Sequence, residues 1–252
     1  MAFYNTQAII LTSQNYGEAD RILTLLSYER GRMRCITKGS RRPRNRFAAL
    51  AQPLNLIEAQ LSGSTGLENL TQAQLVKNYR IIREDLDKLA YASYLLELFD
   101  KATEGASDAA EVFLLLMTAL EMLQYSEDLR MVCLYIELKL LAAIGFFPHI
   151  KICVKCQLPI DKNEPLGYNI VEGGVCCSKC FTQESMLPFS IAGRNLMADC
   201  LSIEPHHISQ VETDEATLNQ VREVARESLR NALGDLPRSI QFLDTVTGDL
   251  SY

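Results

Sequence analysis

The chain of 252 residues lacks any hydrophobic run that is both long and free of charge. Its longest apolar stretch, residues 129–147, contains Arg130, Glu137 and Lys139. Charges near the centre of a segment are costly in a bilayer, so we expect a buried helix here and no contact with a membrane. The N-terminus also lacks a positively charged leader and a small-residue cleavage site, which predicts a cytoplasmic protein.

Motifs that bind nucleotide phosphates or activate a nucleophile are missing as well. The sequence contains no G-x-x-x-x-G-K-[ST] loop, no G-x-G-x-x-G turn and no G-x-S-x-G element. Carboxylates such as Glu84, Asp85 and Asp87 fall on polar helix faces, where we expect solvated surface. These absences predict that the protein is not an enzyme.

The spacing of apolar residues divides the chain into regions. Short runs at 8–14, 21–27, 32–39 and 54–63 are separated by turn residues, which predicts a small closed or nearly closed β-barrel. From Ile81 onward, apolar residues recur every three to four positions, as in amphipathic helices. A segment with glycine, proline and clustered cysteine interrupts the helical pattern. We predict a barrel at 1–80, a helical domain at 81–148 and 186–252, and a metal-binding module at 149–185.

Four of the eight cysteines form two Cys-x-x-Cys pairs with twenty residues between them. They are Cys153, Cys156, Cys177 and Cys180. Disulfides are rare in a reducing cytosol, and the two-residue gap lets both sulfurs of a pair face one ion at about 2.3 Å. Gly173 and Gly174 supply a tight turn before the second pair. The pattern predicts a structural Zn²⁺ site.

A site that has lost its metal and a set of redox thiols remain alternatives. Four sulfurs would fill the tetrahedral coordination and leave no open position for water, so a catalytic zinc is not expected. Cys176 does not keep the two-residue gap to Cys180, and we interpret it as a spare thiol. Cys35, Cys133 and Cys200 have apolar neighbours and are interpreted as small buried residues.

Positive charge is concentrated in residues 30–46 of a chain with 25 basic and 31 acidic residues. This stretch contains eight basic residues and no acidic one. A polyanion explains the pattern, because each Lys or Arg placed on a phosphate releases condensed counterions and because arginine matches phosphate geometry. The predicted phosphate contacts are Arg32, Arg34, Lys38, Arg41, Arg42, Arg44 and Arg46.

The basic stretch is expected to combine a strand with a loop. Arg32 and Arg34 alternate on a predicted strand and should share one face, whereas the arginines from 41 to 46 should lie on a loop that Pro43 keeps extended. An acidic protein partner and an inert solvated loop are the alternatives to nucleic acid. Tyr16, Tyr28 and Phe47 could stack on bases, but we expect each to pack in the core.

Several short motifs follow one another in a fixed order. They are Tyr16–Asp20 (YGEAD), the Gly31 turn, Lys38–Pro43 (KGSRRP), Gln52-Pro53, the two cysteine pairs with Gly173-Gly174 before the second, Leu233-Gly234, Ser239 and Phe242-Leu243. In this order, over nearly the whole chain, they resemble the RecO family of bacterial recombination mediators. Two positions depart from the family pattern, since Gln157 stands where the family often has glycine and Cys176-Cys177 is doubled.

The resemblance implies an α+β multi-domain fold, with an N-terminal OB-fold barrel and an α-helical domain interrupted by a four-cysteine zinc module. It also implies a non-enzymatic, nucleoid-associated task. Such proteins bind single- and double-stranded DNA and anneal complementary strands, including strands coated by single-stranded DNA-binding protein (SSB). With RecR they assist the loading of RecA during repair. Family members without the cysteines support a structural role for the metal.

Two other functions remain open. The basic stretch could dock the acidic tail of SSB or of another acidic partner, with DNA contact incidental. Alternatively, the cysteines could belong to a thiol- or metal-dependent enzyme.

Overall fold

The structure is a computed structural model that describes residues 3–63, 66–104, 109–160, 166–184 and 186–248. The chain divides into two compact units, one formed by Met1–Gln124 with Pro237–Tyr252 and the other by Tyr125–Leu236. The three-part division at residues 80, 148 and 185 stays a prediction. Within the described part of the chain, none of the helices has both the length and the apolar character that a membrane span requires.

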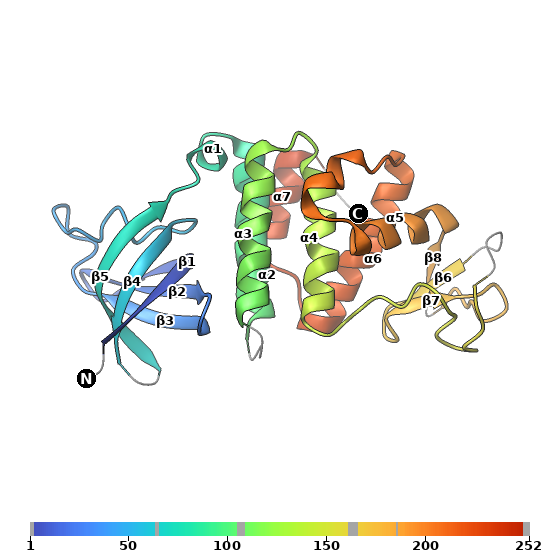
Figure 1. Cartoon of the computed structure of the whole chain (residues 1–252), viewed down its shortest axis with the longest axis horizontal. Helices are drawn as coiled ribbons and strands as arrows, with labels where there is room; N and C mark the ends of the chain where they lie inside the picture. Colours follow the sequence, from blue (N-terminus) through green and yellow to red (C-terminus); the bar gives the residue numbers. More distant parts are fainter. Residues whose placement is uncertain (1–2, 64–65, 105–108, 161–165, 185, 249–252) are drawn as a thin grey trace. The chain divides into compact units, whose positions relative to one another are not determined.

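The first unit begins with a closed five-stranded barrel (Figure 1). Its strands are β1 (Phe3–Tyr16), β2 (Asp20–Ser27), β3 (Gly31–Thr37), β4 (Leu56–Ser62) and β5 (Leu67–Lys77). They are ordered β1-β2-β3-β5-β4, and β4 closes the barrel on β1. β3 and β5 pair in parallel, whereas the other neighbours are antiparallel. This arrangement makes the barrel OB-like.

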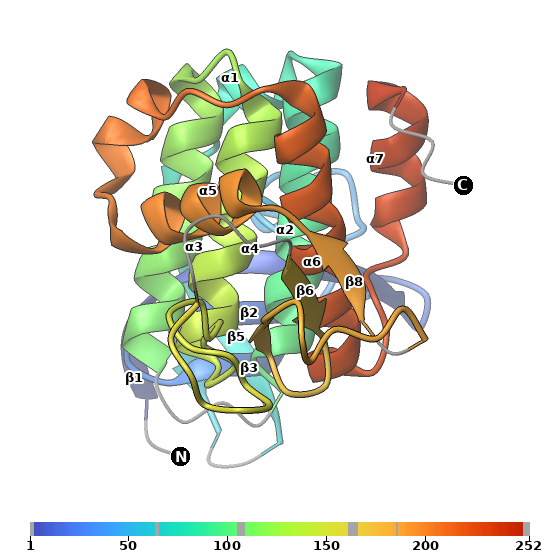
Figure 2. The same cartoon turned by 90° about the vertical axis from the view of Figure 1, so that its right-hand side faces the viewer.

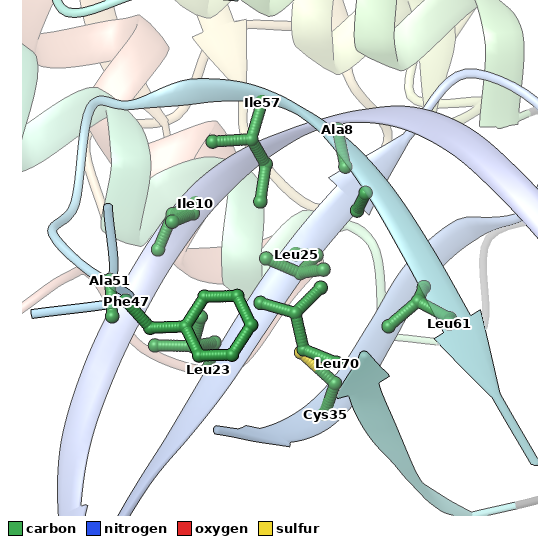
Figure 3. Close-up of a cluster of buried hydrophobic side chains, with 11 residues drawn as sticks. Ala8, Ile10, Leu23, Leu25, Cys35, Phe47, Ala51, Ile57, Leu61 and Leu70 are labelled. Carbon is green, nitrogen blue, oxygen red and sulfur yellow. The ribbon is translucent and has the colours of Figure 1, made fainter. Parts of the chain in front are cut away.

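Alternation along the strands places apolar side chains inside the barrel. Leu23 and Leu25 of β2 and Cys35 of β3 are fully buried in one hydrophobic cluster, which confirms Cys35 as a core residue (Figure 3). Phe47 and Ala51 come from the connection between β3 and β4 and join the same cluster, where the Phe47 ring lies beside Leu23. Truncating a buried phenylalanine to alanine typically costs about 3–5 kcal/mol, so this connection is firmly attached to the barrel.

Four helices complete the first unit. They are α1 (Arg80–Arg83), α2 (Leu86–Ala102), α3 (Ala109–Tyr125) and α7 (Ser239–Thr247). α2 begins after Asp85, whose side chain accepts a hydrogen bond from the Lys88 N–H and so satisfies a free donor of the first turn. α2 contacts β1 on one side and α7 on another.

A carboxylate of α2 attaches the C-terminal helix to the first unit. Glu97 accepts hydrogen bonds from the backbone N–H groups of Arg238 and Ser239 at 3.0 and 2.9 Å, and from the Ser239 hydroxyl at 2.6 Å. Burial alone would raise the pKa of Glu97, but these donors outweigh burial and hold the pKa below its usual value. The negative charge also complements the positive end of the α7 dipole.

The second unit combines four helical segments with a small sheet. The helical segments are α4 (Leu129–Ala143), α5 (Ile191–Ser202), the 3-10 helix η1 (Pro205–Gln210) and α6 (Glu215–Leu233). The strands are β6 (Leu166–Asn169), β7 (Gly174–Cys176) and β8 (Leu187–Phe189), in the order β7-β6-β8 (Figure 1). Figure 2 shows β6 and β8 side by side. Asp128, Ser190 and Asp214 each cap the N-terminus of a helix with a side-chain oxygen. The Ser190 side chain accepts a hydrogen bond from the Gly193 N–H, so this single polar residue specifies where α5 begins.

The predicted fold class is confirmed. An OB-like barrel precedes helices, and the segment between α4 and α5 carries the four clustered cysteines.

Candidate functional site

The strand register sets the orientation of the basic residues on β3. Cys35 lies opposite Leu23, and both face the core. Arg34 lies opposite Thr24, one residue out of phase with that inward-facing pair, so its side chain points out of the barrel. Arg32 is two residues from Arg34 and therefore shares its outer face, as the alternation predicts.

The two arginines of this face have different surroundings. Arg32 Nε lies 2.6 Å from Asp100 Oδ1, and its Nη2 lies 3.2 Å from Glu104 Oε1. Arg34 is exposed and forms no ion pair with any residue that the structure describes. Arg32 therefore joins the barrel to the end of α2, whereas the guanidinium of Arg34 is available to an external anion.

The connection after β3 is a series of tight turns. The backbone N–H of Arg42 donates to the Gly39 carbonyl, that of Asn45 to the Arg42 carbonyl, and that of Ala48 to the Asn45 carbonyl, each at 3.0 Å. The expectation that Pro43 keeps this loop extended is wrong. Pro43 instead occupies the second position of the turn that starts at Arg42, where its fixed φ suits the turn geometry.

Hydrogen bonds join the start of this connection to the β1–β2 hairpin. Asp20 Oδ1 accepts from the Gly39 N–H at 2.7 Å. The Arg41 backbone N–H donates to the Ala19 carbonyl at 2.9 Å, and its Nη1 donates to the Gly17 carbonyl at 3.0 Å. The hairpin and the basic connection therefore share one end of the barrel.

Arg46 is attached to the barrel wall. Its Nη2 donates to the Thr71 carbonyl of β5 at 2.5 Å, and its guanidinium lies 4.7 Å from the centroid of the Phe47 ring. Since Phe47 is buried in the barrel core, the end of the basic connection has a defined position. Arg41 and Arg46 thus attach the loop to the barrel. Each of these bonds uses one guanidinium nitrogen, and the other N–H groups of the side chain remain available to an external anion.

Three other basic side chains of the connection project freely. Lys38, Arg42 and Arg44 are exposed, and their side chains have no hydrogen-bonded or ionic partner among the residues that the structure describes. Several of the predicted phosphate contacts lie at the end of the barrel that carries the β1–β2 hairpin, or on the adjoining outer face of β3. We call this set of residues the basic rim. The basic rim consists of Arg34, Lys38, Arg41, Arg42, Arg44 and Arg46. Arg32 is not included because two carboxylates already contact it.

The three aromatic residues considered for base stacking have separate outcomes. Phe47 packs in the core as predicted. The expectation of core packing is wrong for Tyr28, which remains 44% exposed, although its ring packs edge-on against Phe113 with the ring centroids 5.9 Å apart. The expectation of core packing is wrong for Tyr16, which is 52% exposed at the end of β1. The position of Tyr16 directly before Gly17 of the hairpin could have indicated this exposure, because alternation does not bury the last residue of a strand next to a turn.

The second candidate site is a cluster of four thiols. The Sγ atoms of Cys153, Cys156, Cys177 and Cys180 all lie within 4.8 Å of one another, and those of Cys156 and Cys177 are 3.8 Å apart. In a tetrahedral site with metal–sulfur bonds of about 2.3 Å, the sulfurs lie about 3.8 Å apart. The cluster therefore has the dimensions and the ligand type of a structural zinc site.

Backbone turns bring each pair of thiols together. In the first pair, the Gln157 N–H donates to the Cys153 carbonyl at 2.9 Å. In the second, the Cys180 N–H donates to the Cys177 carbonyl at 3.0 Å. Gln157 adopts a φ of 61°, the left-handed conformation that glycine favours, so the turn is formed even though this residue departs from the family pattern.

The thiols of the cluster differ in acidity. Burial disfavours the Cys153 thiolate, but backbone hydrogen bonds, led by those of Cys156 and Cys177, outweigh burial and lower the pKa to about 6. A hydrogen bond with Cys177 raises the pKa of Cys180 to about 12. Cys176 is buried outside the four-thiol group, and burial raises its pKa to about 11. Cys176 is thus not one of the four clustered thiols, and its role as a spare thiol stays a prediction.

Gly174 occupies a position at which a side chain would collide with the first cysteine turn. An added Cβ would lie 2.5 Å from Val154 Cγ1 and 2.6 Å from the His149 carbonyl oxygen. Backbone hydrogen bonds join the two segments next to Gly174: the Val175 N–H donates to the His149 carbonyl, and the Val154 N–H donates to the Val175 carbonyl. Gly174 therefore allows the two halves of the cluster to approach closely.

Replacing Gly174 with alanine is expected to lower the free energy of unfolding by about 1–3 kcal/mol, as overpacking does, and to weaken metal binding. Equilibrium urea unfolding measures the first effect. Gly173→Ala is the matched control, because Gly173 has a positive φ but open space around its Cβ position, and only about 1 kcal/mol of backbone strain is expected. Equal losses for the two variants would contradict the steric explanation.

The fold and the two sites define a class of protein in which an OB-like barrel with a basic rim is joined to a helical part that carries a four-cysteine cluster. Comparison with known families agrees with this architecture. The chain belongs to the Recombination protein O family, whose N-terminal model matches residues 1–79 and whose C-terminal model matches residues 83–239. Membership of this family assigns the chain to DNA repair and recombination.

Individual relatives support the same assignment. The DNA repair protein RecO of Symbiobacterium thermophilum is 36% identical over 200 residues, which cover 78% of this chain and 79% of that protein. The DNA repair protein RecO of Bacillus pumilus is 31% identical over 220 residues, with coverage of 87% and 85%. That of Heliobacterium modesticaldum is 30% identical over 258 residues, with coverage of 100% and 93%.

Proposed function

We propose that the protein is a recombination mediator that binds single- and double-stranded DNA through the basic rim and anneals complementary strands, including strands coated by SSB. In this proposal it acts with RecR to assist the loading of RecA. The observation that carries the proposal is the gathering of exposed, unpaired basic side chains on the barrel of a Recombination protein O family member. Arg34, Lys38, Arg42 and Arg44 supply free charge, and Arg41 and Arg46 supply anchored charge.

Annealing follows from charge neutralisation and requires no catalytic residue. Two complementary strands repel each other through their phosphates, and a basic surface that covers part of this charge lowers the repulsion. Because the rest of the chain carries an excess of acidic residues, other surfaces would not compete for the same strand. The proposed task is accordingly non-enzymatic.

We further propose that the four-cysteine cluster holds a structural Zn²⁺ through Cys153, Cys156, Cys177 and Cys180. The sulfur-only ligand set and the separations between the sulfurs support this ion. When bound, the ion would cross-link the turn at 153–156 to the turn at 177–180. The residues around it maintain this geometry, since Lys155 forms an ion pair with Glu172 of the β6–β7 hairpin.

Binding and annealing assays with the purified protein test the proposed function. We expect the logarithm of the single-strand binding constant to fall with the logarithm of salt concentration with a slope of about −4, because six contacts contribute about −0.7 each. Annealing of complementary oligonucleotides should be faster with the protein than without it, both for bare strands and for SSB-coated strands. A salt slope near −1 together with no increase in the annealing rate would contradict the proposal.

The alternative is a protein-interaction module whose basic rim docks the acidic tail of SSB or of another acidic partner. The exposed arginines suit carboxylates as well as phosphates, which is the observation that favours it. The same assays separate the two functions. A module of this kind would bind an acidic tail peptide tightly and a bare oligonucleotide only weakly.

A further inference from the structure

Tyr16 is an exposed aromatic residue next to the basic rim. It is 52% exposed, and it has no recorded hydrogen-bond or ring partner within the described ranges of the chain. This exposure places an aromatic face in contact with solvent. The ring is therefore open to an external planar group.

The strand register assigns Tyr16 to the outer face that also carries Arg34. Tyr16 lies opposite Asp20, and Thr12 lies opposite Thr24, which is itself opposite Arg34. Tyr16 is four residues from Thr12, so the two side chains share one face of β1. Tyr16 and Arg34 therefore both point out of the barrel, two strands apart on its curved outer wall.

The loop residues of the basic rim border the other side of Tyr16. The carbonyl of the next residue, Gly17, accepts a hydrogen bond from the Arg41 side chain. The carboxylate of Asp20, the cross-strand neighbour of Tyr16, accepts a hydrogen bond from the Gly39 N–H. Lys38 is adjacent to Gly39 and is exposed. Tyr16 thus lies next to the hairpin turn to which the loop of the basic rim is hydrogen-bonded.

The two acidic residues near Tyr16, Asp20 and Glu18, affect a bound strand differently. Asp20 is engaged by the Gly39 N–H, which satisfies one of its oxygens. Glu18 is exposed at the tip of the hairpin and is a local source of repulsion toward phosphates. A neutral group, such as a base, is therefore better suited than a phosphate to the position directly over the ring.

We propose that Tyr16 is a stacking platform for an unpaired nucleobase and that it gives the protein a preference for single-stranded over double-stranded nucleic acid. This inference rests on the proposed function, since it deepens the DNA-binding role of the basic rim. Aromatic rings bind bases of any sequence by stacking, whereas the bases of a duplex are already stacked on one another. The arginines supply charge to both forms, and the ring distinguishes between them.

Binding of three probes of equal length tests the proposal: a thymidine oligonucleotide, an abasic strand with the same phosphates, and a blunt duplex. Tyr16→Ala is expected to weaken binding of the thymidine strand by about 5- to 100-fold, the range of one lost base–aromatic stack. Binding of the abasic strand and of the duplex should stay unchanged, and so should the salt slope, because no phosphate contact is lost. Tyr16→Phe should retain wild-type binding, because the ring remains.

A spectroscopic readout is available because the protein contains no tryptophan. In the variant Tyr16→Trp, the introduced indole is the single indole of the chain, and stacking on a base is expected to quench its fluorescence. The thymidine strand should quench it, and the abasic strand should not. Tyr28→Ala, which removes another half-exposed ring of the barrel, serves as a control that leaves single-strand preference in place.

The outcomes separate this inference from the proposed function. If the wild type binds all probes with a steep salt slope and Tyr16→Ala binds them equally well, the stacking role is overturned while the basic rim stands. Equal weakening toward all three probes would also overturn it and would indicate a structural role for Tyr16. If the wild type binds no probe, the proposed function fails, and the stacking role fails with it.

Discussion

Replacing Cys153 or Cys180 with serine is expected to release the zinc ion and to lower the melting temperature by about 10 °C. Structural zinc contributes roughly 10–16 kcal/mol in small zinc-binding peptides, so losing one of four ligands should remove several kcal/mol. For a protein of this size, each kcal/mol shifts the melting temperature by about 2–4 °C. Metal analysis of the purified variants and thermal unfolding measure the two effects.

Cys176→Ser is the matched control for these substitutions. Cys176 is adjacent to Cys177 in sequence and is fully buried, yet it lies outside the group of four sulfurs. The variant is expected to retain one zinc ion per chain and to lose only the small packing contribution of its thiol. If Cys176→Ser released the ion and Cys177→Ser retained it, the assignment of the third ligand would be wrong.

Replacing the four free basic residues with alanine is expected to abolish most DNA binding. The substitutions are Arg34→Ala, Lys38→Ala, Arg42→Ala and Arg44→Ala, made together. Four lost phosphate contacts should reduce the salt slope for single strands from about −4 to about −1, and should weaken binding by about 500-fold at 0.1 M salt. Titration of a labelled oligonucleotide at several salt concentrations measures both quantities. Stability should be preserved, because none of the four side chains has a hydrogen-bonded or ionic partner among the described residues.

Arg32→Ala is the informative control for the basic rim. Arg32 belongs to the same basic stretch of sequence but forms ion pairs with Asp100 and Glu104. Its removal is expected to leave the salt slope unchanged and to lower the free energy of unfolding by about 1–2 kcal/mol, because the half-buried Asp100 loses its charged partner. A drop in the salt slope equal to that of one rim residue would show that Arg32 contacts phosphate despite these ion pairs.

The local features of both sites could be predicted from sequence because they depend on short spacings. Two residues between cysteines determine which sulfurs can face one ion, and the structure gathers the same four that the spacing indicated. Alternation on β3 determines that Arg32 and Arg34 share a face and that Cys35 points inward.

Features that depend on distant parts of the chain could not be predicted in this way. Pro43 restricts its own φ and its predecessor, which fits an extended loop as well as a turn, and only the hydrogen bonds from Arg42 to Ala48 selected the turn. Gln157 departs from the family pattern, yet the hydrogen-bonded backbone of the first cysteine turn holds it in the left-handed conformation.

By itself, the sequence determined the order of barrel and helices, the four clustered cysteines and the concentration of positive charge, because each is encoded by periodicity or spacing over a few residues. Only the tertiary structure decided which of those charges are available. Asp100 and Glu104, about seventy residues away, pair with Arg32, while Arg34 on the same strand has no ionic partner in the part of the chain that the structure describes. It also decided that Phe47 fills the barrel and that Tyr16 is exposed, since burial depends on packing between segments that are far apart in sequence.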